Sequence, residues 1–441
     1  MGNRAYTTGS SSTEVHEYVR ALSPKFGFQY LERLSGGRVV KSCLCRYKRQ
    51  GKVILMVYPK QETNATEGQE ESRIAPILRE LEEINRKINL LTHPGVISNK
   101  LIHNSKQALY FARQYFAFNL YDRFHHRPFF SATDKHWVAY QLLQATLQLH
   151  NSGICHGGIK CENILVTTWN WLFLTDMSFF KPTYLPADNP STYNYYFDAE
   201  KQRTTQPCYL APERFYDSKE GAPLDANLTP AMDLFSVGCC LAEIFLDGNV
   251  IFDYSQMLRY RQDDYSPLDS LKKIQNPNVR RLIQSMVQLD PSKRLTAEQY
   301  LGEKPVDGPI KDVIDSVFPS YFKDLYDLLK MLLDPSFAEP DRKIKYLHDK
   351  MQTIFNLISG KANNHQKKGT NVSEGNLDQK LASSASVAAE GNLDDVLYPV
   401  VSSTIESLES FVAIIGRSVE QAEQSHDSEN HALAKGNKGG G

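Results

Sequence analysis

Residues 156–163 read His-Gly-Gly-Ile-Lys-Cys-Glu-Asn, a short polar stretch between two regular segments. Before it, residues 137–150 repeat apolar side chains at the spacing of a buried helix, and after it residues 165–174 predict a β-hairpin. Asp176-Met177-Ser178 begins 13 residues after Asn163. A histidine, a lysine, an asparagine and an aspartate are therefore expected on loops between regular elements, where side chains can meet a ligand.

Two more motifs and a single arginine, Arg294, follow in order, and together with the first two motifs they resemble those of protein kinases. Residues 156–163 resemble the catalytic loop, and 176–178 stand in the place of the D-F-G motif. Ala-Pro-Glu at 211–213 resembles the end of the activation segment, and Asp233 opens a D-x-x-S-x-G stretch typical of a buried central helix. The resemblance implies an α+β fold with two lobes. It also implies an ion pair between Glu213 and Arg294.

The segments around these motifs fit that plan. Three β-rich runs separated by turn residues predict an antiparallel meander, at 28–34, 39–45 and 52–58, and residues 74–91 predict an amphipathic helix. We expect a flexible lead over residues 1–25 and a kinase-like domain over 26–333, its small lobe ending near 118 and its large lobe covering 119–333. A helical extension at 334–360 and a low-complexity tail at 361–441, with one candidate helix, complete the expected organisation.

The residues that hold phosphates in this fold are degraded. Phosphoryl transfer needs a lysine on the third strand, paired with a glutamate of the helix. Alignment on the apolar core of the third strand places Met56 at that position, so Glu82 or Glu83 is expected to face solvent. Lys41, on the second strand, is open to two interpretations: a cation that reaches a phosphate from another direction, or a solvated strand lysine. Likewise Gly36-Gly37 forms either a phosphate cradle or an ordinary hairpin turn.

The catalytic loop has lost its base. The resemblance places an aspartate at position 158, where it would align the substrate hydroxyl and accept its proton. Gly158 has no side chain, so no group can serve there. Gly157 also replaces the arginine that usually contacts an activation-segment phosphate, so regulation by that route is not expected. The loss of both the lysine and the aspartate predicts a pseudokinase.

The metal-binding half of the site is retained. Asn163 and Asp176 are candidate ligands for Mg²⁺ with ATP or GTP, and Lys160 lies near the expected terminal phosphate. Alternatively, both ligands are loop anchors in an empty cleft. His156 is the first residue of the catalytic loop, which it shares with Gly158 and Lys160.

Longer stretches narrow the resemblance. Thr-Trp-Asn-Trp at 168–171, Lys-Pro-Thr-Tyr-Leu-Pro-Ala-Asp-Asn-Pro at 181–190 and Tyr-Leu-Ala-Pro-Glu-Arg-Phe at 209–215 resemble the regulatory subunit 4 family of the class III phosphatidylinositol 3-kinase of vacuolar protein sorting. The family implies the lipid-kinase catalytic subunit and its autophagy and endosomal adaptor subunits as partners. It also implies a cytoplasmic protein that is peripheral on endosomal and autophagic membranes. Because the family's full form is longer, we expect a short or truncated form.

Composition agrees with this interpretation. The formal net charge is −1, which argues against a broad electrostatic surface for nucleic acid. No apolar run is long enough to span a bilayer. The seven cysteines have irregular spacings that complete no zinc motif, so reduced thiols are expected.

The start of the chain carries a separate signal. Met1-Gly2 opens a stretch that resembles an N-myristoylation signal, although Tyr6 departs from it, so Gly2 is a candidate acylation site.

Two functions remain open at this point. The first is a regulatory and scaffolding pseudokinase subunit of the lipid-kinase complex. The second is an active serine/threonine kinase in which Lys41 replaces the missing lysine, and Asp176 or a water replaces the missing base.

Overall fold

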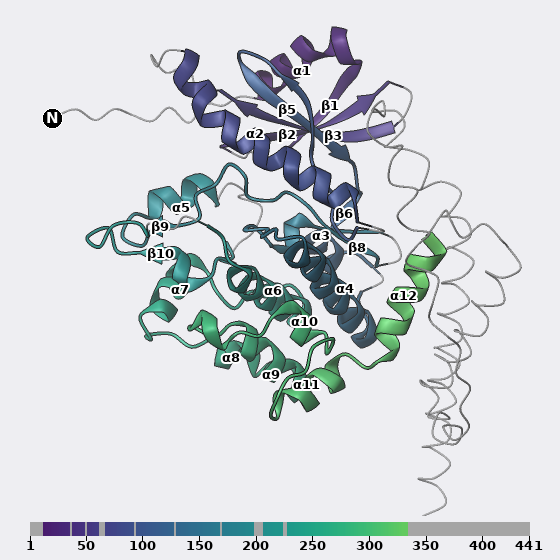
Figure 1. Ribbon diagram of the computed structural model, residues 1–441, viewed down its shortest axis with the longest axis vertical. Helices are drawn as coiled ribbons and strands as arrows, with labels where there is room; N and C mark the ends of the chain where they lie inside the picture. Colours follow the sequence, from purple (N-terminus) through teal and green to yellow (C-terminus); the bar gives the residue numbers. More distant parts are fainter. Residues whose placement is uncertain are drawn as a thin grey trace, which may run out of the picture. The chain divides into compact units, whose positions relative to one another are not determined.

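The structure, a computed structural model, describes residues 12–35, 38–48, 51–60, 67–91, 94–127, 129–167, 170–197, 206–223 and 227–333. The chain divides into two units, Met1–Pro319 and Ser320–Gly441. The first unit has the predicted α+β architecture of a β-rich small lobe and a helical large lobe (Figure 1).

An antiparallel five-stranded sheet forms the small lobe, in the order β1-β2-β3-β5-β4. Its strands are β1 (Phe28–Ser35), β2 (Lys41–Tyr47), β3 (Gly51–Pro59), β4 (Lys100–Asn104) and β5 (Ala108–Gln114). The first three match the predicted meander closely. The helix predicted at 74–91 is α2 (Glu67–Asn89), which begins earlier than predicted.

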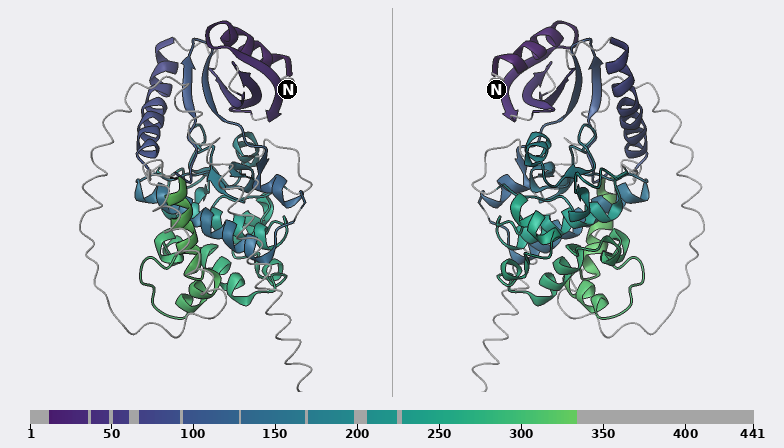
Figure 2. Two further views of the ribbon diagram at one scale, coloured as in Figure 1. Left: turned by 90° about the vertical axis from the view of Figure 1, so that its right-hand side faces the viewer. Right: turned by 90° about the vertical axis from the view of Figure 1, so that its left-hand side faces the viewer.

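The two faces of this sheet are covered by different helices (Figure 2). One face carries an apolar inner-face cluster, which joins the sheet to α2 and consists of Leu44, Ile54, Met56, Ile74, Leu81, Leu109 and Phe111. On the other face, Tyr110 meets Tyr18 of helix α1 (Ser12–Phe26), with ring centroids 6.5 Å apart. The central strands β2, β3 and β5 are therefore buried on both faces over most of their length.

Helix α1 corrects the flexible lead expected for residues 1–25. From residue 12 onward the chain is helical, and Val15, Val19 and Leu22 are buried at successive turns of one face. Burial of each such side chain contributes roughly 1.5–3 kcal/mol relative to its exposed state. This burial stabilises the helix against the small-lobe sheet. The prediction was wrong because these three apolar residues are separated mainly by polar ones, so the overall composition of the segment is polar.

The large lobe is built around two long helices. Helix α4 (Ala132–Asn151) begins at a capping box formed by Ser131 and Asp134. Helix α6 (Pro230–Phe245) is buried at almost every position. The remaining elements are β6 (Phe118–Asn119), α3 (Leu120–Phe124), η1 (Cys161–Asn163), β7 (Ile164–Val166), β8 (Leu172–Leu174), β9 (Leu185–Pro186), α5 (Pro190–Tyr196), η2 (Pro212–Arg214), β10 (Phe215–Tyr216), α7 (Tyr254–Arg261), α8 (Leu268–Leu271), α9 (Pro277–Met286), η3 (Pro291–Lys293), α10 (Ala297–Tyr300) and α11 (Ile310–Val317).

The predicted hairpin at 165–174 is confirmed by the antiparallel pairing of β7 with β8, to which β6 adds a third strand. This small sheet places the end of the catalytic loop, which precedes β7, beside the segment that follows β8 and contains Asp176. All seven cysteines lie among the described residues and are free thiols, as expected.

The second unit contributes helix α12 (Tyr321–Leu333). The predictions for Gly2, for the Gly36-Gly37 turn and for residues 334–441 fall outside the described residues. Among the described helices, none is both long and apolar enough to cross a bilayer.

Candidate functional site

Met56 lies inside the inner-face cluster, at the position where a protein kinase carries its lysine. Its side chain is 6% exposed, and Leu81 of α2 belongs to the same cluster. If Met56 is aligned with that lysine, as the sequence predicts, an apolar cluster stands in place of the lysine–glutamate ion pair of an active kinase. Glu82 and Glu83 are both exposed, as expected, and Glu83 pairs with Arg86 of its own helix at 2.7 Å.

Lys41 does not replace the missing lysine. It is paired with Val57, and Val57 is paired with Tyr110, so these residues share the α1 face of the sheet. Met56 is paired with Ser42 and Phe111 on the opposite face. At 6% exposure Lys41 is also not the solvated strand lysine of the other interpretation, so both are wrong.

The segment that follows Asp176 reaches up to the inner-face cluster. Phe180 stacks on Tyr58 of β3, with ring centroids 4.3 Å apart and an interplanar angle of 19°. It also lies 5.8 Å from the ring of Phe111 on β5. Apolar and aromatic contacts therefore occupy the region in which an active kinase orients phosphates.

His156 is a buried, neutral structural histidine. Its Nε2 lies 2.9 Å from the carbonyl oxygen of Thr175, and its Nδ1 lies 3.2 Å from the backbone nitrogen of Gly158. Because a carbonyl can only accept, Nε2 carries the proton and Nδ1 accepts from Gly158. Burial lowers the pKa of His156, against the opposing charge of Asp233. The loop is thereby fixed in one shape.

Asp233 fixes the same loop from α6. Its carboxylate accepts hydrogen bonds from the backbone nitrogens of His156 and Gly157, at 2.7 and 2.8 Å. His150 lies 3.2 Å from the same carboxylate. Burial opposes ionisation of Asp233, but these donors outweigh it and hold its pKa below the usual range. The buried structural role expected for Asp233 is present.

Gly158 stands where the catalytic base would be, and the position has room for a side chain. A Cβ there would lie 3.6 Å from the Ser178 Cβ and 3.8 Å from the Asn163 Nδ2, which are ordinary contacts. The base is therefore missing because of the residue type, and crowding does not forbid it. Lys160 and Gly158 line a small pocket together with Lys181, Tyr193 and Phe197.

Asp176 is bound by an arginine that the sequence did not single out. The Arg113 Nε lies 3.2 Å from Oδ1 and its Nη2 lies 3.0 Å from Oδ2, and Asn99 donates to Oδ1 at 3.3 Å. Burial would raise the pKa of Asp176, but the charge and hydrogen bonds of Arg113 outweigh it and lower the pKa below its usual value. Asp176 is therefore ionised, and the positive charge of Arg113 balances its negative charge.

This arrangement does not fit a magnesium ion. The Asn163 Nδ2 donates to the carbonyl of Gly158 at 2.8 Å, which leaves its Oδ1 as the atom that could face a cation. Mg²⁺ needs oxygen ligands at about 2.0–2.1 Å and usually retains waters. Both carboxylate oxygens of Asp176 already accept hydrogen bonds from Arg113, and Oδ1 accepts a further one from Asn99. The two expected ligands lie close together, but one is engaged.

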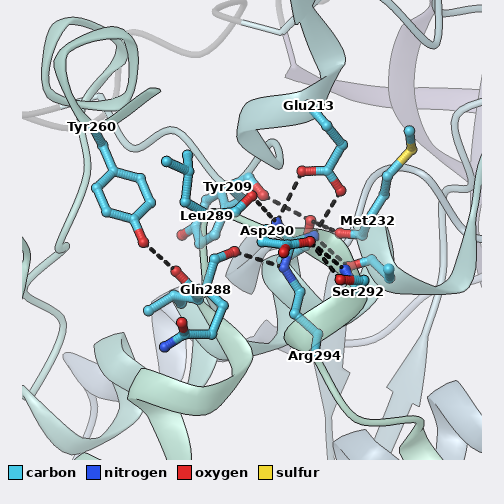
Figure 3. Close-up of polar contacts among 12 residues, drawn as sticks. Tyr209, Glu213, Met232, Tyr260, Gln288, Leu289, Asp290, Ser292 and Arg294 are labelled. Carbon is cyan, nitrogen blue, oxygen red and sulfur yellow. Dashed lines mark hydrogen bonds and ion pairs between the residues drawn. The ribbon is translucent and has the colours of Figure 1, made fainter. Parts of the chain in front are cut away.

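The ion pair expected between Glu213 and Arg294 is present (Figure 3). The Arg294 guanidinium donates to both carboxylate oxygens, at 2.6 and 2.9 Å, and the Arg294 side chain is fully buried. It also donates to the carbonyls of Gln288 and Ala231, at 2.8 and 2.9 Å. This cluster fastens the end of the activation segment to the start of α6.

A second arginine, Arg214, fastens the other end of that segment. It is 1% exposed and donates to the carbonyls of Thr183, Pro182 and Gly157, at 2.7, 3.1 and 2.7 Å. Burial lowers the pKa of Arg214 to about 10, although the charge of Asp233 opposes this. The activation segment is thus tied to the catalytic loop through carbonyl groups.

Gly157 is required by its backbone and its surroundings. Its φ is +68°, and a Cβ there would lie 2.3 Å from the Ser178 Oγ and 2.4 Å from the Leu228 Cδ1. No side chain fits, so the phosphate-contacting arginine expected in other kinases cannot be placed here.

Three residues that shape the site, Arg113, Arg214 and Phe180, were not predicted from the sequence. Arg113 could have been noticed as a charge at the end of an otherwise apolar strand, and Arg214 as a charge next to the Ala-Pro-Glu motif. Phe180 offered no signal, because its stacking partners come from strands far away in the chain.

Comparison with known proteins agrees with this geometry. A family model described as the protein kinase domain matches residues 28–304. The serine/threonine-protein kinase VPS15 of Arabidopsis thaliana is 40% identical over 338 residues, which cover 76% of this chain and 21% of that protein. The serine/threonine-protein kinase VPS15 of Saccharomyces cerevisiae is 34% identical over 337 residues, 75% of this chain and 22% of that protein. The chain thus spans about a fifth of the length of these relatives. It belongs to the protein kinase family, and its kinase domain is similar to those of proteins named VPS15.

Proposed function

We propose that this chain is a regulatory and scaffolding pseudokinase subunit of a class III phosphatidylinositol 3-kinase complex. It would act in endosomal sorting, vacuolar protein targeting and autophagy. The observation that carries the pseudokinase part is the pair Gly158 and Met56. Neither position offers a group that could accept a proton or hold a phosphate, while the rest of the fold is intact.

The regulatory part rests on similarity. The stretches at 168–171, 181–190 and 209–215 resemble regulatory subunit 4 of that complex, and the VPS15 relatives cover three quarters of the chain. The proposed partners are the lipid-kinase catalytic subunit and its autophagy and endosomal adaptor subunits. The proposed location is the cytoplasmic face of endosomal and autophagic membranes, with acylation of Gly2 as the anchor.

The alternative is an active serine/threonine kinase, which the names of the relatives favour. It requires a cation at the phosphates and a base near the substrate hydroxyl. Lys41 lies on the wrong face of the sheet to be that cation. Asp176 is engaged by Arg113, which leaves the alternative without its two proposed residues.

Binding to ATP or GTP remains part of the proposal. Protein kinase domains in general hold ATP with Mg²⁺. For this chain, we propose that any nucleotide supports the fold and is not turned over.

One experiment separates the two functions. The full chain is co-expressed with the catalytic subunit of class III phosphatidylinositol 3-kinase and, as the control, with that of a class I enzyme. We expect co-purification with the class III subunit only. Co-purification with neither would remove the regulatory assignment.

The same preparation is assayed for phosphate transfer from labelled ATP and GTP to a protein substrate. We expect no incorporation above that of the Asp176→Ala variant. Incorporation that the Asp176→Ala change abolishes would establish the active kinase instead.

A further inference from the structure

Arg113 is an unusual residue for its place in the fold. It follows five buried residues of β5, Ala108–Ala112, and its side chain is 9% exposed. The guanidinium is engaged within the protein, because its Nη1 donates to the carbonyl of Gln114 at 3.2 Å and its Nε and Nη2 both donate to Asp176. A charge in such a place is costly unless a partner balances it, and here the partner is a carboxylate.

The two N–H groups meet the two oxygens of one carboxylate. This side-by-side geometry matches a planar guanidinium to a carboxylate and is among the strongest charge-assisted arrangements in proteins. Asn99 adds a third donor to Oδ1, and Thr175 lies 3.4 Å from the same atom. Every described neighbour that reaches the Asp176 carboxylate is therefore a donor, and the group is satisfied without an ion.

A divalent cation at Asp176 would have to displace this arginine. The displaced guanidinium would remain among the apolar residues of β5 and the inner-face cluster, since Phe111 on the same face of the strand is 3% exposed. Leaving a buried charge unpaired is strongly unfavourable. The competition is thus between an intramolecular cation that is always present and a dissolved one that must also shed water.

We propose that Arg113 is a built-in cation that takes the place of the metal at Asp176, so that the cleft does not bind divalent cations through this residue. This role of Arg113 is confined to the cleft and does not depend on whether the chain joins a lipid-kinase complex. It gives the surviving D-F-G aspartate a structural role, because Asp176 then ties the activation segment to strand β5 across the two lobes.

The test uses Mn²⁺ alone as the probe, because the unpaired electrons of this ion report binding directly. The full chain, Asp176→Asn, Arg113→Met and the double variant are titrated with Mn²⁺ and free ion is measured by electron paramagnetic resonance. Arg259→Met is the matched control, because Arg259 also pairs with an aspartate, Asp264, but at an exposed site. We expect the wild type, Asp176→Asn and Arg259→Met to bind Mn²⁺ equally weakly. We expect Arg113→Met to gain a site about tenfold tighter or more, and the double variant to lose it.

Two results would overturn the proposal. One is Mn²⁺ binding by the wild type that Asp176→Asn removes, and this comparison needs no Arg113 variant. The other is an Arg113→Met protein with a native circular dichroism spectrum that gains no Asp176-dependent site. If Arg113→Met does not fold, Arg113→Gln replaces it, since its amide keeps polar contacts but carries no charge.

Discussion

Met56 and Lys41 lie on adjacent strands of one sheet, but their side chains are on opposite faces. Ser42, the neighbour of Lys41, is the residue paired with Met56. A displacement of one residue along a strand moves a side chain to the other face. The position that would anchor phosphate is therefore apolar, and the nearest lysine on β2 cannot replace it.

We predict that Met56→Lys destabilises the fold and restores no phosphate transfer. The new ammonium group would enter the inner-face cluster, where it has no carboxylate partner because Glu82 and Glu83 are exposed. The expected loss is about 2–4 kcal/mol of the free energy of unfolding, measured by urea denaturation. Met56→Leu is the control, with a loss below about 1.5 kcal/mol. Equal stability of the two variants would contradict the burial described for this site.

The neighbouring glycines of the catalytic loop are predicted to respond in opposite ways. Gly157→Ala should lose about 2–4 kcal/mol, because it adds a left-handed backbone penalty to two close contacts. Gly158→Ala should stay within about 0.5 kcal/mol of wild type, since its Cβ meets only ordinary contacts. Thermal melts of the two variants side by side decide the matter. A large loss in Gly158→Ala would show that the loop has less space than described.

The Glu213–Arg294 pair is predicted to stabilise the large lobe far more than a surface pair does. Glu213→Gln leaves the buried Arg294 without a counter-charge and should cost about 2–4 kcal/mol, discounted because Glu213 is 20% exposed. Asp269→Asn removes a pair whose side chains are 71% and 88% exposed, and it should leave the free energy of unfolding nearly unchanged. Chemical denaturation measures both. Similar losses for the two variants would argue against a structural role for Glu213.

Arg214 is predicted to keep the activation segment ordered. Arg214→Met removes three donors to buried carbonyls, and Arg214→Lys keeps the charge but cannot reach all three. Hydrogen exchange of the amides of residues 183–185 should rise about tenfold or more in both variants, a change of roughly 1.4 kcal/mol in local stability. Arg259→Met, at an exposed site, should leave these amides unchanged. Unchanged protection in Arg214→Lys would mean that charge alone suffices.

Stability is predicted to fall as the pH is lowered from 7.5 to 5.5. The pKa of His156 is lower in the folded state than in the unfolded chain, so below about pH 6.5 the unfolded chain binds a proton that the folded one does not. The loss is at most about 1.4 kcal/mol per pH unit for one group. Asp176 and Asp233 have the same sign, but their lowered pKa values act only at more acidic pH. His156→Gln should flatten the curve of melting temperature against pH in this window, and an unchanged slope would assign it to another group.

Elements with strong local signals were predictable from the sequence. The meander, the hairpin and α4 follow from apolar spacing and turn residues, and the Glu213–Arg294 pair follows from motif order. Lys41 was not predictable, because its face depends on the register of β2, and the pairing of β1 with β2 contains two irregularities. Helix α1 was missed because its apolar stripe lies in a polar lead.

For the candidate site, the sequence predicted which catalytic side chains are missing, but it did not predict which residues replace them. An absent side chain such as that of Gly158 is visible in the sequence without any structure. A replacement such as Arg113 is not, because it becomes meaningful only when β5 is placed beside Asp176, 63 residues later in the chain. Long-range pairing of this kind is set by tertiary packing and leaves no periodic pattern.

The carbonyl contacts of Arg214 bear on how such a protein could be controlled. An activation segment that a phosphate holds in place can be switched by a kinase and a phosphatase, because the fastening group is added and removed. Here the fastening group is a side chain of the chain itself, and its acceptors are main-chain oxygens that no enzyme alters. Pro182 and Thr183 are therefore held beside the catalytic loop without any added group. A kinase and a phosphatase would have no fastening group to add or remove at this point of the segment.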